Sequence, residues 1–411
     1  MKAKIIVRDY DTKKDQKAVH RVWREVGWIE KGKEKVMDMF MKGCDVTVAE
    51  VGGEAEFLTA LSSGDIQYLD KKLPFSGVMA VTTGRITRKM GLAGKVTSEA
   101  IADSALKGSC VSGLGIFEQG FYDMLGYRTG NYEHFISFDP ADLKNVGTFR
   151  IPKRISEKNW KKVHNSRMKR MRKHGSVNFF EKEITGAEMR WTTKGFGLGY
   201  ENDKGEITHF FWGAPHGENG PYNIDCIAYR TYEQFLELLA LIKSLGDQVR
   251  MVRIGEPPYI QMQDFLKQPF RFRQLTERSK YENKMTAVAW WQMRILDLKE
   301  CMKQTSLSCE KIKFNLILDD PIKKHLDKTS KWQGIGGDYT ITLGKKCKAA
   351  PGHEKGLPVM AAGVGAFTGM WLGFRPASTL AVSDNLHADA KLLDRLDAAF
   401  LLPDAKPDWA F

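Results

Sequence analysis

Residues 77–94 read GVMAVTTGRITRKMGLAG, and this stretch decides which fold we expect for the first part of the chain. Its apolar first half is typical of a strand that ends near Thr83, and a helix is expected to follow. At the start of that helix, Arg88, Gly91 and Ala93 form the pattern R-x-x-G-x-A. Backbone N–H groups at a helix N-terminus carry partial positive charge and hold phosphate, provided that no side chain blocks the approach. The two small residues leave that approach open, although they would equally suit close packing of the helix on the strand.

A second pattern follows at Gly113–Arg128, which reads GLGIFEQGFYDMLGYR and is typical of a strand and a short helix. Together the two stretches resemble the acetyl-CoA-binding motifs of the GNAT N-acetyltransferase superfamily. The second stretch is similar to the family motif that contacts the pantetheine and thiol end of the cofactor. More narrowly, nearly the whole chain resembles the Eis-like (enhanced intracellular survival) proteins, including Trp291–Leu298, residues 363–381 and the ending on Phe411.

The resemblance implies an α+β / α/β fold class, with tandem GNAT-like domains followed by an α+β domain of the sterol-carrier-protein type. We expect residues 1–145 to form a GNAT domain that binds acetyl-CoA and carries out catalysis. Residues 146–290 are expected to form a second GNAT-like domain without the cofactor motif, because no R-x-x-G-x-A follows a strand there. Residues 291–411 are expected to form the sterol-carrier-like domain, whose C-terminus returns to the active site.

The resemblance also implies which residues hold acetyl-CoA. The strand before the helix is expected to run along the pantetheine, and the helix start is expected to cradle the pyrophosphate. The residues concerned are Met79, Ala80, Val81, Arg88, Lys89, Gly91, Leu92, Ala93 and Gly94. Two departures from the family pattern bear on this site. Residues 82–87 read TTGRIT where the family usually has an apolar residue and a proline, and Met90 stands where a basic residue is common.

Two residues are candidates for the proton transfers. Tyr122 resembles the family's general acid, which protonates the departing CoA sulfur, whereas from the residues alone packing at a helix end is the more common role of Tyr122 or Tyr127. We expect catalysis from Tyr122 and packing from Tyr127. The resemblance assigns the base to the carboxylate of Phe411, where the alternative is a frayed tail. Trp409 and Phe411 argue against fraying, because a solvated tail gains nothing from two large aromatic side chains.

The charge of the chain is strongly basic and unevenly placed. Its 411 residues carry a formal net charge of +13, and residues 150–173 hold eleven Lys and Arg against one acid, Glu157. A solvated basic face is the ordinary interpretation of such a run, and a polyanion-binding patch is the alternative. Trp160 is the one aromatic residue in this window, so a base-stacking platform is missing. We therefore expect no nucleic-acid partner.

The composition excludes several other classes of protein. Apolar residues make up 42% of the chain and aromatic residues 11%, which is enough for real cores and rules out global disorder. No apolar run of about 18 residues is present, so we expect no membrane span, and the first residues do not form a signal peptide. Six cysteines without a C-x-x-C pair and nine histidines without ligand spacing give no expectation of a metal site or a disulfide. These features favour a cytoplasmic protein.

We therefore expect an acetyl-CoA-dependent N-acetyltransferase that acts without a metal, by direct attack of an amine in a ternary complex. The acceptor is a small-molecule amine, an aminoglycoside or lysine, and the resemblance implies a homo-oligomer, a hexamer. One alternative is a GNAT-like scaffold that has lost catalysis and binds a lipid or another apolar ligand through its C-terminal domain. The other is a polyanion binder that uses residues 150–173. The presence of R-x-x-G-x-A, Tyr122 and Phe411 together favours the enzyme.

Overall fold

The strand that opens the 77–94 stretch is the last part of a longer strand, β4, in the computed structural model, which describes residues 4–269 and 278–410. It lies in a sheet with the order β1-β2-β3-β4-β5-β15-β6, and β9 pairs with β3. In this sheet the β4–β5 pair is parallel, and the other described strand pairs are antiparallel. The strands are β1 (Ile5–Asp9), β2 (Asp45–Val51), β3 (Glu54–Tyr68), β4 (Lys71–Thr83), β5 (Val111–Gly115), β6 (Arg128–Thr129), β9 (Val177–Phe179) and β15 (Trp291–Ile295).

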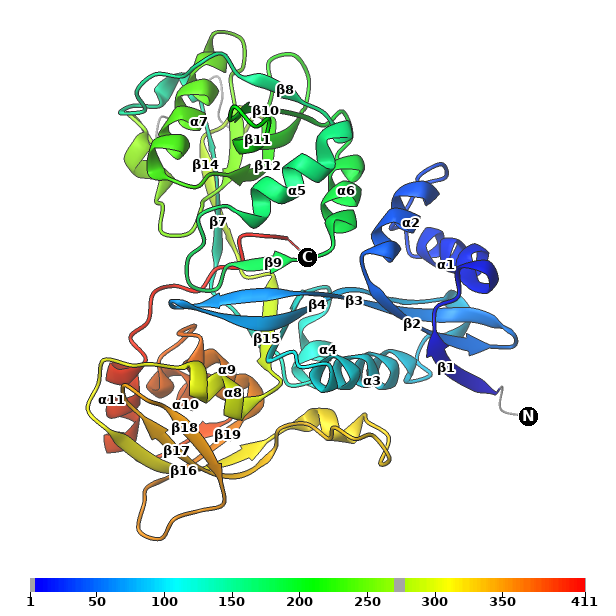
Figure 1. Ribbon diagram of the computed structural model, residues 1–411, viewed down its shortest axis with the longest axis vertical. Helices are drawn as coiled ribbons and strands as arrows, with labels where there is room; N and C mark the ends of the chain where they lie inside the picture. Colours follow the sequence, from blue (N-terminus) through cyan, green and yellow to red (C-terminus); the bar gives the residue numbers. More distant parts are fainter. Residues whose placement is uncertain (1–3, 270–277, 411) are drawn as a thin grey trace. The chain divides into compact units, whose positions relative to one another are not determined.

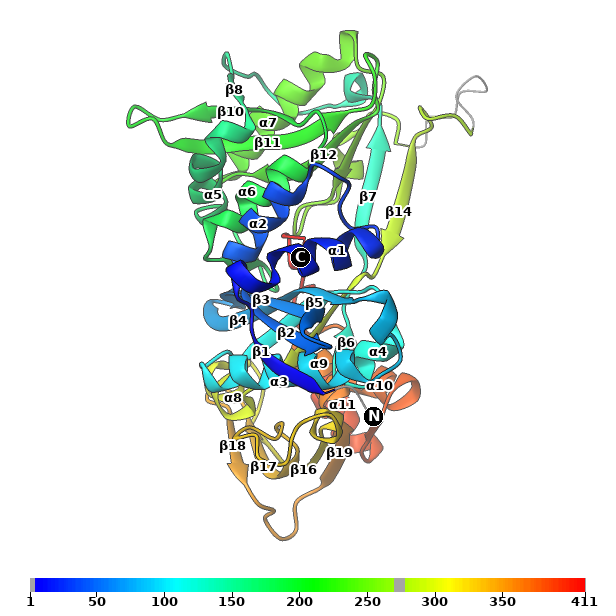
Figure 2. The same ribbon diagram turned by 90° about the vertical axis from the view of Figure 1, so that its right-hand side faces the viewer.

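Helices cover both faces of this sheet (Figures 1 and 2). One face carries α1 (Thr12–Glu25) and α2 (Glu34–Lys42), and the other carries α3 (Leu92–Leu106) and α4 (Gln119–Asp123). Because both faces are covered, the central strand β3 is buried without interruption over residues 55–62. On the α3 side, Phe57 of this strand packs with Leu92 and Val96 of the helix. The sheet and α3 are thereby held in fixed register.

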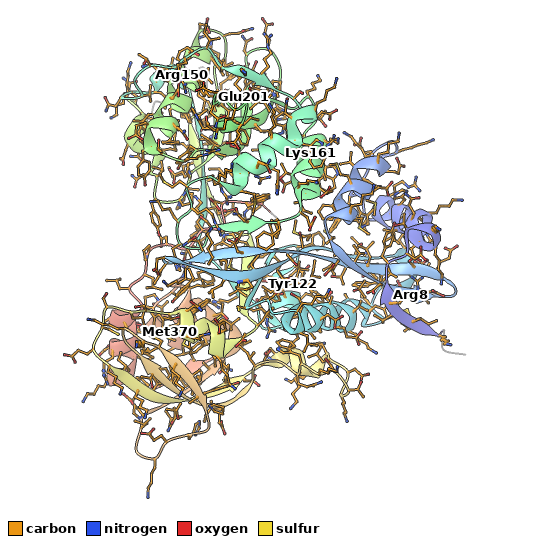
Figure 3. The ribbon with its side chains drawn as sticks, viewed as in Figure 1. Arg8, Tyr122, Arg150, Lys161, Glu201 and Met370 are labelled. Carbon is orange, nitrogen blue, oxygen red and sulfur yellow. The ribbon has the colours of Figure 1, made fainter. Side chains whose placement is uncertain are left out.

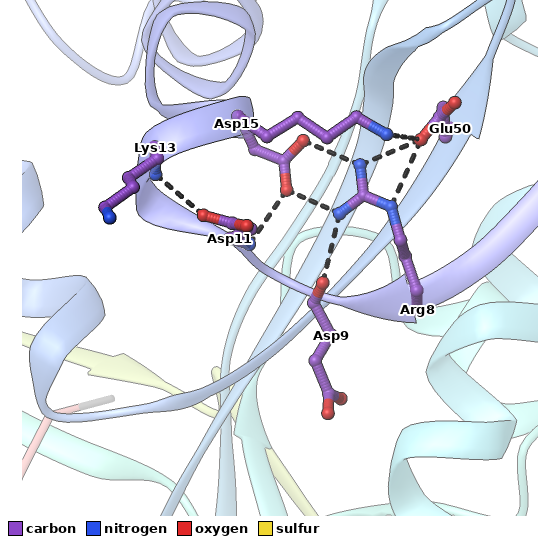
Figure 4. A network of polar contacts seen from close by, with 7 residues as sticks. Arg8, Asp9, Asp11, Lys13, Asp15 and Glu50 are labelled. Atoms are coloured by element: carbon purple, nitrogen blue, oxygen red, sulfur yellow. Dashed lines mark hydrogen bonds and ion pairs between the residues drawn. The ribbon is translucent and has the colours of Figure 1, made fainter.

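An ion-pair network joins the first strand to the helix that follows it (Figure 4). The Arg8 guanidinium donates to the two oxygens of Asp15 at 2.6 and 2.8 Å and to Glu50 Oε2 at 2.9 Å. Asp15 lies in the first turn of α1 and is buried, and the backbone N–H of Asp11 donates to it at 2.9 Å. Burial pushes the pKa of Asp15 upward, but the bonds from Arg8 and Asp11 outweigh burial and hold this pKa below its usual value. The network ties β1 and β2 to the N-terminal end of α1. Loss of Arg8 would leave the buried carboxylate of Asp15 without its ion-pair partner.

A smaller sheet lies in the C-terminal part of the chain, in the order β18-β17-β16-β19-β20, with β16 and β19 parallel. Ile312, Phe314 and Leu316 alternate along β16 and are buried, which is the period-2 pattern of a strand with one face in a core. The mixture of strands and helices agrees with the expected α+β class, and the sterol-carrier likeness stays a prediction. The elements are α8 (Leu298–Gln304), β16 (Ile312–Asp319), η6 (Pro321–Lys324), β17 (Gly337–Leu343), β18 (Lys348–Pro351), β19 (Val359–Gly363), α9 (Val364–Trp371), α10 (Ala377–Ser383), β20 (Leu386–His387) and α11 (Ala390–Ala399).

A further sheet has the order β14-β7-β13-β12-β11-β10-β8. Its elements β8-α5-α6-β10-β11-β12-α7-β13 repeat the order β1-α1-α2-β2-β3-β4-α3-β5 of the first sheet, apart from β9. In both sheets the strands on either side of the crossover helix form the parallel pair. The same topology therefore occurs twice. The elements are β7 (Glu133–Phe138), η2 (Pro140–Asp142), β8 (Lys153–Ile155), η3 (Glu157–Asn159), α5 (Trp160–Met168), α6 (Lys182–Trp191), β10 (Phe196–Glu201), β11 (Ile207–Pro215), β12 (Tyr222–Ala228), α7 (Tyr232–Ser244), η4 (Leu245–Asp247), β13 (Val252–Gly255), η5 (Met262–Phe265) and β14 (Lys284–Val288).

The strand pairings divide the chain into two compact units. The first consists of Met1–Asn131, His174–Phe179 and Trp290–Phe411, and the second of Tyr132–Lys173 and Phe180–Ala289. The first unit therefore contains two of the sheets. The expected division into residues 1–145, 146–290 and 291–411 stays a prediction, and β7, β9 and β15 pair across its boundaries. Such pairings join segments far apart in the sequence, so no local pattern announces them.

Candidate active site

β4 and β5 separate where the cofactor strand was expected. Their parallel pairing ends at Val78↔Leu114, and beyond this pair β4 keeps β3 as its strand neighbour on one side only, within the described residues. The β3–β4 register shifts at the same point, with Met79 as the extra residue of a β-bulge. Such a bulge bends the strand and re-aims its side chains. Met79 and Val81 are partly exposed and Ala80 is buried, so the strand presents an open edge here.

The loop after β4 leads into α3 without a side-chain cap. Gly91 is the N-cap residue with φ +77°, and no side chain of the described residues bonds to the first N–H groups. A Cβ built at Gly91 would meet no described heavy atom within 4 Å, so the space before the helix is open. Among the described residues the first turn has no acid, and Arg88 and Lys89 are exposed just before it. The free N–H groups of this turn are therefore available to an anion.

The residues that open α3 present backbone rather than side chains. Leu92 is buried and packs with Phe57 beneath the helix, so its side chain belongs to the core. Ala93 is partly exposed and small. A Cβ at Gly94 would lie 3.1 Å from His325 Nδ1, which leaves little room for any side chain.

The loop itself is held by residues that the sequence pattern did not single out. The Gly84 N–H and the Thr87 hydroxyl donate to the Glu56 carbonyl at 2.6 and 3.3 Å. The Arg85 N–H donates to the Glu25 carboxylate at 3.0 Å. A Cβ at Gly84 would overlap the Glu56 carboxylate and lie 3.0 Å from the Glu56 carbonyl oxygen, so any side chain here would force Glu56 to shift. These anchors come from β3 and α1, and nothing in the 77–94 stretch points to them.

Tyr122, labelled in Figure 3, lies on α4. Its ring belongs to the same core cluster as Val78 and Leu114, the last pair before β4 and β5 separate. The helix begins at Glu118, whose carboxylate accepts a bond from the Phe121 N–H at 2.7 Å. Burial, with a smaller contribution from Glu118, raises the pKa of Tyr122 to about 12. The side chain is thus a neutral phenol at physiological pH and can donate a proton.

Tyr127 is bonded within the core instead. The Ser112 hydroxyl donates to the Ser76 carbonyl at 2.9 Å, and Tyr127 Oη lies 2.7 Å from Ser112 Oγ. Because the serine proton is already used, the Tyr127 hydroxyl is the donor in this second bond. Burial raises the pKa of Tyr127 above its ordinary value. Its place between β5 and the end of α4 agrees with a packing role.

The C-terminal segment runs along β9 inside the first unit. The Val177 N–H donates to the Pro407 carbonyl at 2.9 Å, and the Lys406 N–H donates to the His174 carbonyl at 3.1 Å. Trp409 is buried and packs edge-on against Phe179, with ring centroids 5.6 Å apart. Up to Trp409, then, the segment is fixed beside the first sheet rather than frayed. Phe411, the expected base, lies outside the described residues, and its role stays a prediction.

The chain was compared with known protein families, curated sequences and solved structures. No protein-family model and no curated protein sequence matches the chain. In three dimensions it is similar to a probable N-acyltransferase of Enterococcus faecalis V583, with 16% identity, 100% of both chains covered and a TM-score of 0.79. It is also similar to a GCN5-related N-acetyltransferase of Anabaena variabilis (11% identity, 99% and 100% covered, TM-score 0.78) and to Eis1 of Mycobacterium abscessus (12%, 99% and 100%, 0.74). The chain has the fold of GCN5-related N-acetyltransferases.

In the sheet of the second unit, the crossover helix α7 begins with a side-chain cap, unlike α3. Thr231, the N-cap residue of α7, accepts a bond from the Gln234 N–H at 3.3 Å with its own hydroxyl. Glu233 adds a negative charge in the first turn, and the Gln234 side chain accepts from the Arg230 N–H at 2.8 Å. The N-terminus of α7 is thus capped and acidic, whereas that of α3 is uncapped and has basic neighbours.

Several basic residues of the run at 150–173 form ion pairs with acids of the second unit. The pairs are Arg150–Glu237, Lys153–Glu201, Lys162–Glu201, Arg167–Glu188 and Lys169–Glu206. Lys161 lies with its ammonium 5.4 Å from the Trp160 ring centroid. These pairs agree with the ordinary interpretation of the run as a basic face, and Arg167 and Arg170 are buried within it.

Two kinds of feature are absent from residues 4–269 and 278–410. No group of three or more His, Cys, Asp or Glu side chains there could hold a metal ion. No helix there combines the length and the apolar character needed to cross a bilayer.

Proposed function

We propose that the protein is an acetyl-CoA-dependent N-acetyltransferase that transfers an acetyl group to an amine by direct attack. The observation that carries this proposal is the separation of β4 from β5 at Val78 and Leu114, followed directly by the uncapped start of α3. An open strand edge can pair with the amides of pantetheine, and a free helix start can hold a pyrophosphate. The GNAT fold of the whole chain supports the same assignment.

The residues expected for acetyl-CoA fit this task in different ways. Met79, Ala80 and Val81 would offer backbone groups along the free edge of β4, because no described strand pairs with that side. The N–H groups of Leu92, Ala93 and Gly94 would face the pyrophosphate, since α3 has no cap, and Gly91 would leave room for it. Arg88 and Lys89 would add positive charge at the rim.

Acetyl transfer forms an N–C bond and breaks a C–S bond. The neutral amine attacks the thioester carbonyl carbon, the amine gives up a proton, and the sulfur leaves as a thiolate that gains one. Tyr122 would donate that proton, because it is protonated at neutral pH and packs beside the end of the β4–β5 pairing. Backbone N–H groups of residues 79–81 would stabilise the oxyanion. The carboxylate of Phe411 stays our candidate for the base.

The acceptor amine is proposed by class only: a small-molecule amine, an aminoglycoside or a lysine side chain. A homo-oligomer, a hexamer in the Eis-like proteins, is proposed on resemblance alone and is open to light scattering. The competing proposal is a scaffold that has lost catalysis and holds an apolar ligand in its C-terminal part. It does not account for the uncapped start of α3 and the open space at Gly91. The polyanion proposal is disfavoured by the ion pairs of the basic run.

The experiment combines acetyl-CoA binding, measured by calorimetry, with thiol release in the presence of a monoamine, an aminoglycoside and a lysine peptide. We expect saturable binding and thiol release with at least one amine. Acetyl-CoA should also raise the melting temperature, since it binds only the folded chain. A folded chain that binds no acetyl-CoA would overturn the proposal, and binding without transfer to any amine would favour the scaffold.

A further inference from the structure

Arg294 is a charged residue with no exposure to solvent, in the W-Q-M-R-I-L-D-L stretch at the C-terminal side of the fold. It lies in β15, where it faces Ser112 of β5 in the pairing register. A buried guanidinium is retained only where its donors find partners, because the cost of removing it from water is large. The partners of Arg294 therefore show what the strand holds in place.

One partner is the end of α4. Arg294 Nη1 donates to the Leu125 carbonyl, and the Leu125 N–H in turn donates to the Tyr122 carbonyl at 2.9 Å. Gly126, with φ +80°, lets the guanidinium approach, because a Cβ at this position would lie 3.1 Å from Arg294 Nη1. A helix as short as α4 has little stability of its own, so contacts at its two ends decide where it sits. Glu118 holds the start and Arg294 holds the end.

The other partner is Asp320, at the end of β16 in the C-terminal sheet. Arg294 Nη2 donates to Asp320 Oδ2 at 2.6 Å, and the exposed fractions of the two side chains are 0% and 1%. Asp320 also accepts from the Ile335 N–H at 2.9 Å and the Ile322 N–H at 3.3 Å. Its carboxylate is therefore fixed by the backbone of the C-terminal part, and it orients the arginine.

The same segment reaches the surroundings of Tyr122 by packing. Ile322 and Leu326 are buried in the core cluster that contains Tyr122, and Trp332 packs against that cluster. The Arg294 guanidinium lies 5.4 Å from the Trp332 ring centroid. Figure 1 shows the segment between β16 and β17 passing beside α3. Polar and apolar contacts thus connect the C-terminal sheet to the short helix that bears the candidate acid.

We propose that Arg294 is a positioning residue, which with Asp320 fixes the end of α4 and so sets where the Tyr122 hydroxyl points. This inference rests on the proposed function, because Arg294 acts through Tyr122 and touches no substrate. It gives the C-terminal sheet a part in the reaction that does not depend on the end of the chain. Lysine cannot replace arginine here. Its single ammonium lacks the planar fork of the guanidinium, so it cannot bond to the Leu125 carbonyl and the Asp320 carboxylate together.

The test compares Arg294→Lys with a matched control. Arg8→Lys alters another arginine of the same sheet, whose guanidinium donates to Asp15 at 2.6 and 2.8 Å and whose side chain is 24% exposed. In folded protein we expect Arg294→Lys to lower kcat about tenfold to hundredfold, as a misplaced group does, with the KM for acetyl-CoA unchanged. Arg8→Lys should change neither. Combined with Tyr122→Phe, Arg294→Lys should cause no further loss, because both act through one hydroxyl.

A second readout does not need activity. With 3-fluorotyrosine incorporated at position 122, the ¹⁹F resonance should shift or broaden in Arg294→Lys but not in Arg8→Lys. An unchanged resonance together with a kcat within about twofold of wild type would overturn the positioning role. If Tyr122→Phe is fully active while the resonance still moves, the proposed function fails at its acid and the structural coupling stands. Should Arg294→Lys not fold, the pair Arg294→Met with Asp320→Leu removes both charges together and is measured in its place.

Discussion

The ring of Phe179 lies over Gly77, so closely that a Cβ at Gly77 would be 2.5 Å from Phe179 Cε1. Gly77 directly precedes Val78, the last residue of β4 that pairs with β5. Phe179 also packs nearly perpendicular to the ring of Trp409, with the ring centroids 5.6 Å apart. Phe179 therefore contacts both Trp409 of the C-terminal segment and the point where β4 and β5 separate. Any side chain at position 77 would displace the Phe179 ring.

Phe179→Ala should release this C-terminal segment. Removing a buried phenylalanine costs about 3–5 kcal/mol, and here it also takes away the ring that Trp409 packs on. We expect faster proteolysis near residues 405–409 and reduced turnover, with the affinity for acetyl-CoA retained. Phe235→Ala in the second unit is the matched control. Phe235 is equally buried, but it packs in a different hydrophobic core, which does not include this segment. Equal proteolysis rates in the two variants would contradict the prediction.

Gly91→Val should weaken acetyl-CoA binding. The valine would need a positive φ, at a strain of about 1–3 kcal/mol, and its side chain would occupy the open space before α3. Loss of one or more charge-assisted bonds would raise the KM for acetyl-CoA about tenfold or more. The control is Gly108→Val at the other end of the same helix, where φ is +98° and a described neighbour within 4 Å is likewise missing. The two variants should have similar melting temperatures. A KM for acetyl-CoA that rises equally in both would contradict a pyrophosphate site at the start of α3.

Local patterns in the sequence predicted much of the fold. The Gly52-Gly53 pair in the sequence is typical of a hairpin turn, and it forms the β2–β3 turn with both glycines at positive φ. Asp297 followed three residues later by Glu300 is a sequence pattern typical of a helix start, and the Asp297 carboxylate accepts from the Glu300 N–H at 2.9 Å. These features rest on neighbours within a few residues, so they can be read from the chain itself.

The contacts that complete the site could not be predicted in this way. The strand pattern that begins at Glu54 in the sequence ends near Leu61, but β3 extends to Tyr68, because β4 pairs with it as far as Tyr68↔Lys71 and β9 pairs with residues 64–66. The partnership of Arg294 with Asp320 and Leu125 joins three separate parts of the chain. Alternation and helical spacing carry no information on which distant segment becomes a neighbour.

Tyr122→Phe should lower kcat by about 10²–10⁴ and leave the KM for acetyl-CoA unchanged, because it removes only the proton donor. Tyr127→Phe is the matched control: it deletes the bond to Ser112, which costs about 0.5–1.5 kcal/mol of stability, and should spare kcat. Since the pKa of Tyr122 is raised to about 12, loss of its proton should not limit the rate below about pH 10. Steady-state kinetics over pH 6–10 would decide, and a kcat within about threefold of wild type would remove Tyr122 from the mechanism.

The stability of the first unit should fall as the pH drops from about 6.5 towards 4, because of His174. The Leu69 N–H donates to His174 Nδ1 at 3.1 Å, and Nε2 donates to the Leu372 carbonyl at 3.1 Å, so the neutral ring is the one that fits. Burial lowers the pKa of His174 from 6.5 to about 4. In that interval the unfolded chain binds the proton and the folded chain does not, so the contribution is fully present above pH 6.5 and is lost on acidification. Its size is on the order of 3 kcal/mol.

Urea unfolding of wild type and His174→Asn at pH 7.5, 5.5 and 4.5 measures this contribution. Asparagine can still accept from the Leu69 N–H but takes up no proton, so the variant should lose less stability on acidification than wild type does. His387→Asn, at an exposed position, is the control and should follow wild type. A residual slope is expected in every variant, because burial also lowers the pKa of His164 in the second unit to about 4. Since the Lys406 N–H donates to the His174 carbonyl, acid should also loosen the C-terminal segment before the whole unit unfolds. Identical pH profiles for His174→Asn and wild type would show that this histidine is not the acid-sensitive group.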